Sequence, residues 1–226
     1  MMETLNIYGD SRINEKGSFG CDISSQRLDD LDKEAIQCIL LLHRKDLNCI
    51  DLGCGEGKVG IIMSMIGANV VLIDKVNIAE KIEPIAGNFN LNLKFVNKDA
   101  RELQKKDLPR PLDVCYSQRF IHYLKFSEAE KLINLLSKNM TKGSIFFISA
   151  SGLNSELGQG YADKNKPVTK RFATLSKKLA EKHNIIEPVC LYTEQDLENL
   201  ITRFGFKVRS LKSSDFGNIK GIFEKI

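Results

Sequence analysis

The chain lacks several features that would place it in a specialised class of protein. It has no tryptophan, only three histidines, and no apolar run of the roughly 20 residues that cross a bilayer. Ser64 and Asn69 interrupt its longest nearly apolar stretch, 60–73. Residues 1–10 contain no basic region followed by an apolar one, so we expect no secretory signal. These absences predict a cytoplasmic protein with no membrane partner.

Cysteine and histidine are placed too sparsely to indicate a metal centre. Six cysteines lie at positions 21, 38, 49, 54, 115 and 190, with no C-x-x-C pair and no histidine at ligand spacing. Cys49 and Cys115 fall in predicted buried strands, where a free thiol behaves as a small apolar residue. We therefore predict reduced, inert thiols and no bound metal.

The composition that is present fits a single globular domain. A chain of 226 residues with 42% hydrophobic and 27% charged residues is too short for two domains of typical size. We therefore treat residues 1–226 as one domain. Its net charge of +4 is uneven, because residues 151–190 hold seven Lys/Arg against four Asp/Glu.

Apolar periodicity alternates between strand and helix patterns along the chain. Runs typical of buried strands occur at 48–52, 70–74, 93–97, 112–117 and 144–150. Helix patterns occur at about 28–43, 58–66, 77–88 and 127–139. Such alternation predicts a doubly wound, mostly parallel α/β sheet with flanking helices.

The C-terminal part breaks this alternation. Thr193 and Asp196 have the spacing of a helix cap, which predicts a helix ending near Phe204, before Gly205. Residues 206–211 and 217–224 then read as two strands that pair as an antiparallel hairpin. Together with the five strands above, these two predict a sheet of seven strands.

The most informative segment is Asp51-Leu52-Gly53-Cys54-Gly55-Glu56-Gly57, which follows the first strand. Glycines there permit a tight turn with positive φ and a close approach of backbone N–H groups to a ligand. The stretch 55–60 also matches G-x-G-x-x-G, so a dinucleotide-binding turn is a second interpretation. Both interpretations place a ligand at the carboxyl edge of the sheet.

Two further acids favour a ligand other than a dinucleotide. Asp51, Asp74 and Asp99 each end a predicted strand, and they are separated by 23 and 25 residues, about one strand–helix unit each. Three successive strands therefore deliver a carboxylate to one edge. A ribose diol, an exocyclic amine and a sulfonium cation suit carboxylates, whereas a pyrophosphate suits a helix N-terminus.

With this pattern the chain resembles the class I S-adenosylmethionine-dependent methyltransferases, most closely over residues 45–150. The resemblance implies S-adenosylmethionine as cofactor and S-adenosylhomocysteine as product. It places Asp51 to Gly57 under the methionine part, Asp74 at the ribose hydroxyls, and Asp99 at the adenine edge. The full set of cofactor-binding residues it implies is Arg12, Asp51, Leu52, Gly53, Cys54, Gly55, Gly57, Asp74, Lys75, Asp99, Ala100, Arg101, Ser117, Gln118 and Phe120.

The resemblance also divides the domain into segments. It implies an N-terminal lid at 1–27, a cofactor-binding core at 28–150, an insertion at 151–190 that holds the acceptor or forms a lid, and a final helix and strand pair at 191–226. Tyr161 is the aromatic we expect in the insertion's lid. His122, in the segment after the fourth strand, is a candidate general base, and a histidine that only orients that segment is the alternative.

The methyl acceptor is less constrained than the cofactor. No Asp/Asn-Pro-Pro-aromatic tetrapeptide and no Pro-Cys dipeptide follow the fourth strand, which argues against methylation of DNA bases. A small molecule held under the insertion is our first hypothesis. Two alternatives stay open: an RNA or protein acceptor docked on the basic insertion, and a catalytically silent regulator that only binds the cofactor.

Overall fold

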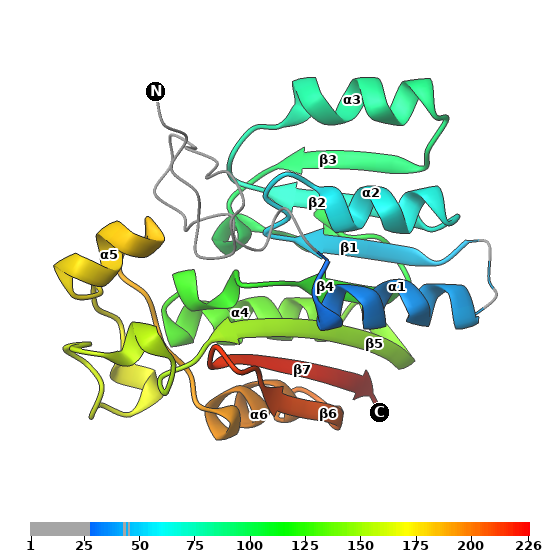
Figure 1. The fold of residues 1–226 in the computed structure, drawn as a ribbon. Helices are drawn as coiled ribbons and strands as arrows, with labels where there is room; N and C mark the ends of the chain where they lie inside the picture. Colours follow the sequence, from blue (N-terminus) through cyan, green and yellow to red (C-terminus); the bar gives the residue numbers. More distant parts are fainter. Residues whose placement is uncertain (1–27, 43, 45) are drawn as a thin grey trace, which may run out of the picture.

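The computed structural model describes residues 28–42, 44 and 46–226. It contains one seven-stranded sheet in the order β3-β2-β1-β4-β5-β7-β6 (Figure 1). The strands are β1 (Asn48–Leu52), β2 (Asn69–Asp74), β3 (Leu93–Asn97), β4 (Leu112–Ser117), β5 (Met140–Ser151), β6 (Phe206–Ser213) and β7 (Asn218–Lys225). The predicted fold class, including its antiparallel C-terminal hairpin, is confirmed.

Strands β1 to β5 run parallel, and β7 pairs antiparallel with both β5 and β6. The order reverses at β1, because β2 and β3 extend the sheet to one side and β4 and β5 to the other. This reversal opens a crevice at the carboxyl ends of β1 and β4, which is where open α/β sheets bind ligands.

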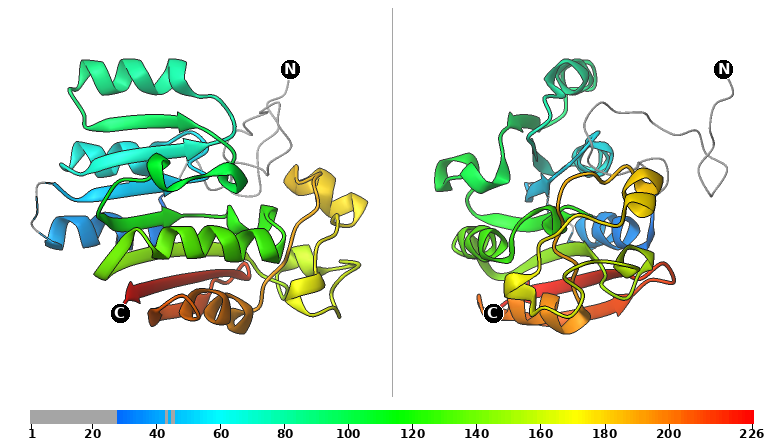
Figure 2. Two further views of the ribbon diagram at one scale, coloured as in Figure 1. Left: turned by 180° about the vertical axis from the view of Figure 1, so that it is seen from behind. Right: turned by 90° about the vertical axis from the view of Figure 1, so that its left-hand side faces the viewer.

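Helices cover both faces of the sheet (Figure 2). One face carries α1 (Asp30–Leu42), α2 (Lys58–Met65) and α3 (Ala79–Asn88), and the other carries α4 (Phe126–Ser137) and α6 (Glu194–Thr202). Alternate residues of a strand supply the two cores: Cys49 and Val114 pack with α1 and α2, whereas Ile50 and Cys115 pack with α4 and α6. The central strands β1 and β4 are buried along almost their whole length because helices cover both of their faces.

The segment between β5 and α6 builds a structure of its own. It contains one short helix, α5 (Lys177–His183), and a separate apolar cluster made by Leu153, Leu157, Tyr161, Leu175, Leu179, Ile185, Val189 and Leu191. In Figure 1 this segment stands beyond the carboxyl ends of the parallel strands. Within the described residues, no helix has the length and apolar character needed to span a membrane.

Candidate functional site

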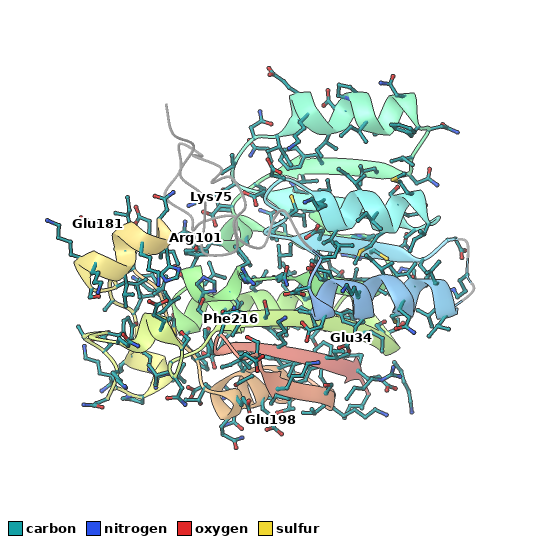
Figure 3. The ribbon with its side chains drawn as sticks, in the orientation of Figure 1. Glu34, Lys75, Arg101, Glu181, Glu198 and Phe216 are labelled. Atoms are coloured by element: carbon teal, nitrogen blue, oxygen red, sulfur yellow. The ribbon has the colours of Figure 1, made fainter. Side chains whose placement is uncertain are left out.

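A cleft of about 1330 Å³ lies at the carboxyl ends of the parallel strands. Two sides of it matter below. The sheet wall consists of the residues that line it after β1, β2 and β3, within 51–59, 73–78 and 98–101. The insertion wall consists of those within 151–157 and 183–185. The segment after β4 and the turn between β6 and β7 complete the cleft, and Figure 3 shows Lys75, Arg101 and Phe216 around it.

The turn after β1 is held in place by its own backbone. Gly53 and Cys54 donate their N–H groups to the carbonyl of Ile73 at 2.8 and 3.2 Å, which ties the turn to the end of β2. Gly53 has φ +68°, and a Cβ built there would lie 2.4 Å from Cγ of Phe120. Glycine is therefore required at this position for both conformation and space.

Asp51 lies at the base of the turn and is only 3% exposed. Its Oδ2 accepts a hydrogen bond from the N–H of Gly60, in the first turn of α2, at 3.0 Å. The pKa of Asp51 is raised to about 7: burial is the main cause, the Gly60 hydrogen bond opposes it, and the neighbouring carboxylates of Asp32 and Asp74 add to it. This carboxyl group is poised to ionise when a cation approaches it.

Asp74 ends β2 and faces the same turn. Its Oδ2 accepts from the N–H of Gly55 and its Oδ1 from the N–H of Val76, both at 2.9 Å. Burial raises its pKa in spite of these two bonds. Each carboxylate oxygen can accept more than one hydrogen bond, so the fixed carboxylate retains acceptor capacity toward the cleft.

Asp99 follows β3 and is bound to a cation of its own segment. Its oxygens accept from the backbone N–H and Nε of Arg101 at 2.9 Å each, and from a terminal guanidinium nitrogen at 2.5 Å. The side-chain bond to Arg101 holds the pKa of Asp99 below its usual value. Asp99 is therefore ionised at neutral pH, unlike the buried Asp51.

The segment after β4 adds polar groups from a distant part of the chain. Ser117 donates its hydroxyl to the carbonyl of Leu52 at 3.0 Å and braces β4 against β1. Gln118 donates Nε2 to Asp29 at 2.5 Å, and its Oε1 accepts from the Tyr116 hydroxyl at 3.0 Å. The same hydroxyl shares its single proton with Asp32, near Asp29 at the start of α1.

Asp32 is a cleft residue that our sequence analysis missed. It is 2% exposed, and burial raises its pKa to about 6, against the Tyr116 hydrogen bond. Its partner Tyr116 is 84 residues away in the chain. In sequence, Asp32 is one of several acids near a helix start, so only the folded arrangement distinguishes it.

His122 lies beneath the cleft and is 2% exposed. Its Nδ1 accepts from the N–H of Ser151 at 3.4 Å, and its carbonyl accepts from the N–H of Cys190 at 2.8 Å. Burial, with a smaller contribution from the charge of Arg119, lowers the pKa of His122 to about 3. The neutral imidazole thus joins the segment after β4 to β5, and the backbone carbonyl joins it to the end of the 151–190 segment.

Most of the sequence-predicted site residues meet in one cleft. Those that line it are Asp51, Gly53, Cys54, Gly55, Asp74, Lys75, Asp99, Ala100, Arg101, Gln118, Phe120 and His122. Leu52, Gly57 and Ser117 lie behind this lining, where Leu52 and Ser117 are 1% exposed. Arg12 and the predicted lid at 1–27 lie outside the described residues.

Tyr161 does not form the predicted lid. It is 3% exposed, packs in the apolar cluster of the 151–190 segment, and donates its hydroxyl to the carbonyl of Val189 at 2.5 Å. It is absent from the cleft lining, whereas Phe216 in the β6–β7 turn lines the cleft and is 59% exposed. The aromatic at the rim thus comes from the hairpin and not from the insertion.

The fold defines an α/β protein with a cleft at the carboxyl ends of its parallel strands, where Asp51, Asp74 and Asp99 line the sheet wall. A family model described as a methyltransferase domain matches residues 26–211. The chain therefore belongs to this methyltransferase-domain family, and the resemblance to class I S-adenosylmethionine-dependent methyltransferases is confirmed.

A curated relative and solved structures agree with this assignment. Phosphoethanolamine N-methyltransferase 1 of Triticum aestivum is 27% identical over 144 residues, which is 61% of this chain and 29% of the relative. The chain thus matches less than a third of that protein's length.

Two solved structures are similar in fold. An S-adenosylmethionine-dependent methyltransferase from Clostridium acetobutylicum has a TM-score of 0.66 at 12% identity, covering 90% of this chain and 95% of that one. The 1,6-didemethyltoxoflavin-N1-methyltransferase of Burkholderia thailandensis, solved with its substrate and S-adenosylhomocysteine, has a TM-score of 0.63 at 15% identity, covering 90% and 81%.

Proposed function

We propose that this protein transfers a methyl group from S-adenosylmethionine to a small-molecule acceptor and releases S-adenosylhomocysteine. The observation that carries the proposal is the meeting of three carboxylates, Asp51, Asp74 and Asp99, on the sheet wall around one glycine turn. The family assignment supports the cofactor, as do neighbours solved with S-adenosylmethionine or S-adenosylhomocysteine.

The residues fit the chemistry of this cofactor. Asp74, held by two backbone amides, has lone pairs left for the ribose hydroxyls. Asp51 offers a carboxyl group that ionises readily beside a sulfonium or ammonium cation. Asp99 and the Ala100 backbone would meet the adenine edge. Bound there, the cofactor supplies an activated methyl group, and this chain supplies its orientation.

Methyl transfer by in-line displacement needs mainly two reactants held in attack geometry with water excluded. The cleft has room for both, since its volume of about 1330 Å³ exceeds the 300–1,000 Å³ that is typical of pockets for one ligand. The space beyond the sheet wall reaches the insertion wall and the β6–β7 turn. We place the acceptor there, between Phe216 and the segment after β4.

His122 fits the orienting role better than the role of general base. A base with a pKa of about 3 takes a proton poorly at neutral pH, because an effective base has a pKa near the working pH. Its ring nitrogen and carbonyl already hold the 151–190 segment against β4. We propose that His122 fixes the floor of the acceptor space, and its catalytic role stays a prediction.

The basic residues of 151–190 favour a small acceptor over RNA. Three of these seven side chains form ion pairs with acidic residues of the same chain: Arg171 with Asp196, Lys166 with Asp163, and Lys182 with Glu156. The names of the relatives point the same way, since they include phosphoethanolamine and didemethyltoxoflavin as substrates. An RNA or protein acceptor remains the second candidate, carried only by the net charge of this segment.

Calorimetric titration with S-adenosylmethionine, S-adenosylhomocysteine and NAD in parallel tests the cofactor. We expect the first two to bind and NAD to give no heat, whereas binding of NAD alone would overturn the proposal. Release of S-adenosylhomocysteine with a panel of acceptors, including phosphoethanolamine and structured RNA, then tests turnover. Tight cofactor binding with no methyl transfer to any acceptor would favour the silent regulator.

A further inference from the structure

Arg119 is one of the residues that line the cleft. It follows β4 between Gln118 and Phe120, and all three residues line the cleft. Its backbone is left-handed, with φ +51°, and its N–H donates to the Ser149 hydroxyl on β5 at 2.9 Å. A left-handed arginine is uncommon and costs conformational energy, and residues held in this way cluster at functional sites.

Among the described residues, no carboxylate pairs with the guanidinium of Arg119. Its Nε is buried and makes no hydrogen bond, and within 28–42, 44 and 46–226 it forms no ion pair. Each of the other described arginines has a side-chain partner: Arg44, Arg101, Arg171, Arg203 and Arg209 pair with carboxylates, and Arg110 donates to a carbonyl. The side chain of Arg119 is partly buried. A cation that is partly withdrawn from water and has no counter-charge is stabilised by an anionic ligand.

The charge of Arg119 acts on residues that follow β4 and on Asp32. Burial lowers the pKa of His122, and the charge of Arg119 lowers it further. Burial raises the pKa of Tyr123, and the charge of Arg119 offsets part of that rise. Burial likewise raises the pKa of Asp32 against the charge of Arg119, and the oxygens of Asp32 are already bonded to the Tyr116 hydroxyl and the Asp29 N–H. Asp51 and Asp74, on the sheet wall, owe their pKa shifts to burial and to other neighbours.

We propose that Arg119 binds an anionic group, a carboxylate or a phosphate, on the methyl acceptor and so selects acidic acceptors. Guanidinium matches both groups because its planar N–H donors can bind two oxygens at once. The proposal rests on the methyltransferase function proposed above. In it, Arg119 binds the acceptor and does not bind the cofactor.

The test uses inorganic phosphate and acetate as probes on the full chain, with and without saturating S-adenosylhomocysteine, at constant ionic strength set by chloride. Binding is followed by calorimetry and by the rise in unfolding temperature. The variants are Arg119→Gln and Arg119→Lys, which keep the same backbone strain. Arg209→Gln is the matched control, since it removes an arginine charge from the half-exposed pair with Glu224 on the hairpin.

We expect at least one probe to bind the wild type saturably, and the preferred probe indicates whether the acceptor's acid is a phosphate or a carboxylate. Arg119→Gln should weaken this binding about tenfold or more, as expected for loss of charge-assisted hydrogen bonds, while Arg119→Lys retains part of it. Arg209→Gln should bind like the wild type. Affinity for S-adenosylhomocysteine should stay within about twofold throughout, because the cofactor contacts other residues.

Three results would overturn the assignment. In the first, neither probe binds the wild type, with or without S-adenosylhomocysteine. In the second, Arg119→Gln binds phosphate or acetate as well as the wild type does. In the third, Arg119→Gln loses affinity for S-adenosylhomocysteine by tenfold, which would place Arg119 at the cofactor. Absence of S-adenosylhomocysteine binding in the wild type is a separate result, which contradicts the proposed function itself.

Discussion

The sheet wall and the insertion wall enclose the same cleft, but they are held by different kinds of contact. On the sheet wall, Asp51 and Asp74 are fixed by backbone N–H groups of the adjoining turns. The insertion wall depends on contacts between side chains within the 151–190 segment, such as those of Glu156, which accepts from Lys182 and His183. We therefore expect the sheet wall to keep its structure when neighbouring side chains are changed. The insertion wall should lose stability when one of its side-chain contacts is removed.

We expect the largest loss of stability from the removal of Arg171, whose side chain supports the insertion wall. The side chain is buried and donates to the carbonyls of Leu191 and Lys166 and to Asp196, at 2.6 to 2.9 Å. Arg171→Ala leaves those acceptors unpaired, and we expect a loss of about 3–5 kcal/mol in the free energy of unfolding. Urea unfolding measures it.

Arg203→Ala is the control for Arg171→Ala. Arg203 pairs with Glu130 on the surface, and its side chain is 53% exposed, so its loss should cost about 0–1 kcal/mol. If the two variants unfold at the same urea concentration, the buried contacts of Arg171 do not stabilise the insertion wall as we infer.

A second test separates conformation from contact on the sheet wall. Gly53 and Gly55 both have positive φ, but only a Cβ at Gly53 would meet Phe120, while one at Gly55 has no atom within 4 Å. Gly55→Ala should cost about 1–2 kcal/mol for the left-handed backbone. Gly53→Ala should cost about 1–3 kcal/mol more, because Phe120 must move.

Thermal or urea unfolding of these two glycine variants without ligand gives the comparison. Equal destabilisation would mean that Phe120 shifts freely, and the turn would then not be braced by the segment after β4. The larger loss at Gly53 would instead show that the sheet wall depends on one contact from outside its own backbone.

The third test concerns the carboxylate of the sheet wall that we assign to the ribose. Asp74→Ala should weaken binding of S-adenosylhomocysteine by about 1.5–3 kcal/mol, the range for a hydrogen bond to a charged group. Asp46→Ala is the control, because its side chain is 81% exposed and precedes β1 at the opposite end of the strand. Calorimetry measures both, and an unchanged affinity in Asp74→Ala would remove Asp74 from the site.

The contrast between the walls also explains which features the sequence could predict. Asp51, Asp74 and Asp99 were predictable because each lies at a strand end, and parallel strands bring such ends to one edge. The start of α6 was predictable because its capping box, Thr193 with Asp196, is local. These features depend on residues close together in the chain.

Other features depend on pairs far apart, which spacing does not reveal. Asp32 becomes a cleft residue only through Tyr116, and Tyr161 is buried only because Val189 and Ala173 pair beside it. Strand β5 begins at Met140, four residues before the predicted start at 144, because Met140 pairs with Leu112 across an irregularity in the register. Tertiary contacts decided each of these outcomes.

The smallest effect we predict is a pH dependence that belongs to the sheet wall alone. The pKa of Asp51 is raised to about 7 by burial, so below pH 7 the carboxyl group is mostly protonated in the ligand-free protein. A bound sulfonium favours the ionised form and lowers that pKa in the complex. Binding of S-adenosylmethionine must then release a proton as the pH falls below 7, and its affinity drops in that range.

S-adenosylhomocysteine lacks the sulfonium, and this difference isolates the effect. Between pH 7 and pH 5.5 we expect the affinity ratio of S-adenosylmethionine to S-adenosylhomocysteine to fall by about five- to tenfold, or about 1 kcal/mol. This range lies below the usual pKa of an α-amino group, about 7.7–8.0, so both ligands keep a protonated amine. In Asp51→Asn, which can still accept from the Gly60 N–H, the ratio should be independent of pH. A wild-type ratio that stays constant would show that the buried carboxyl group does not face the sulfonium, and Asp51 would then serve the turn and α2 rather than the cofactor's charge.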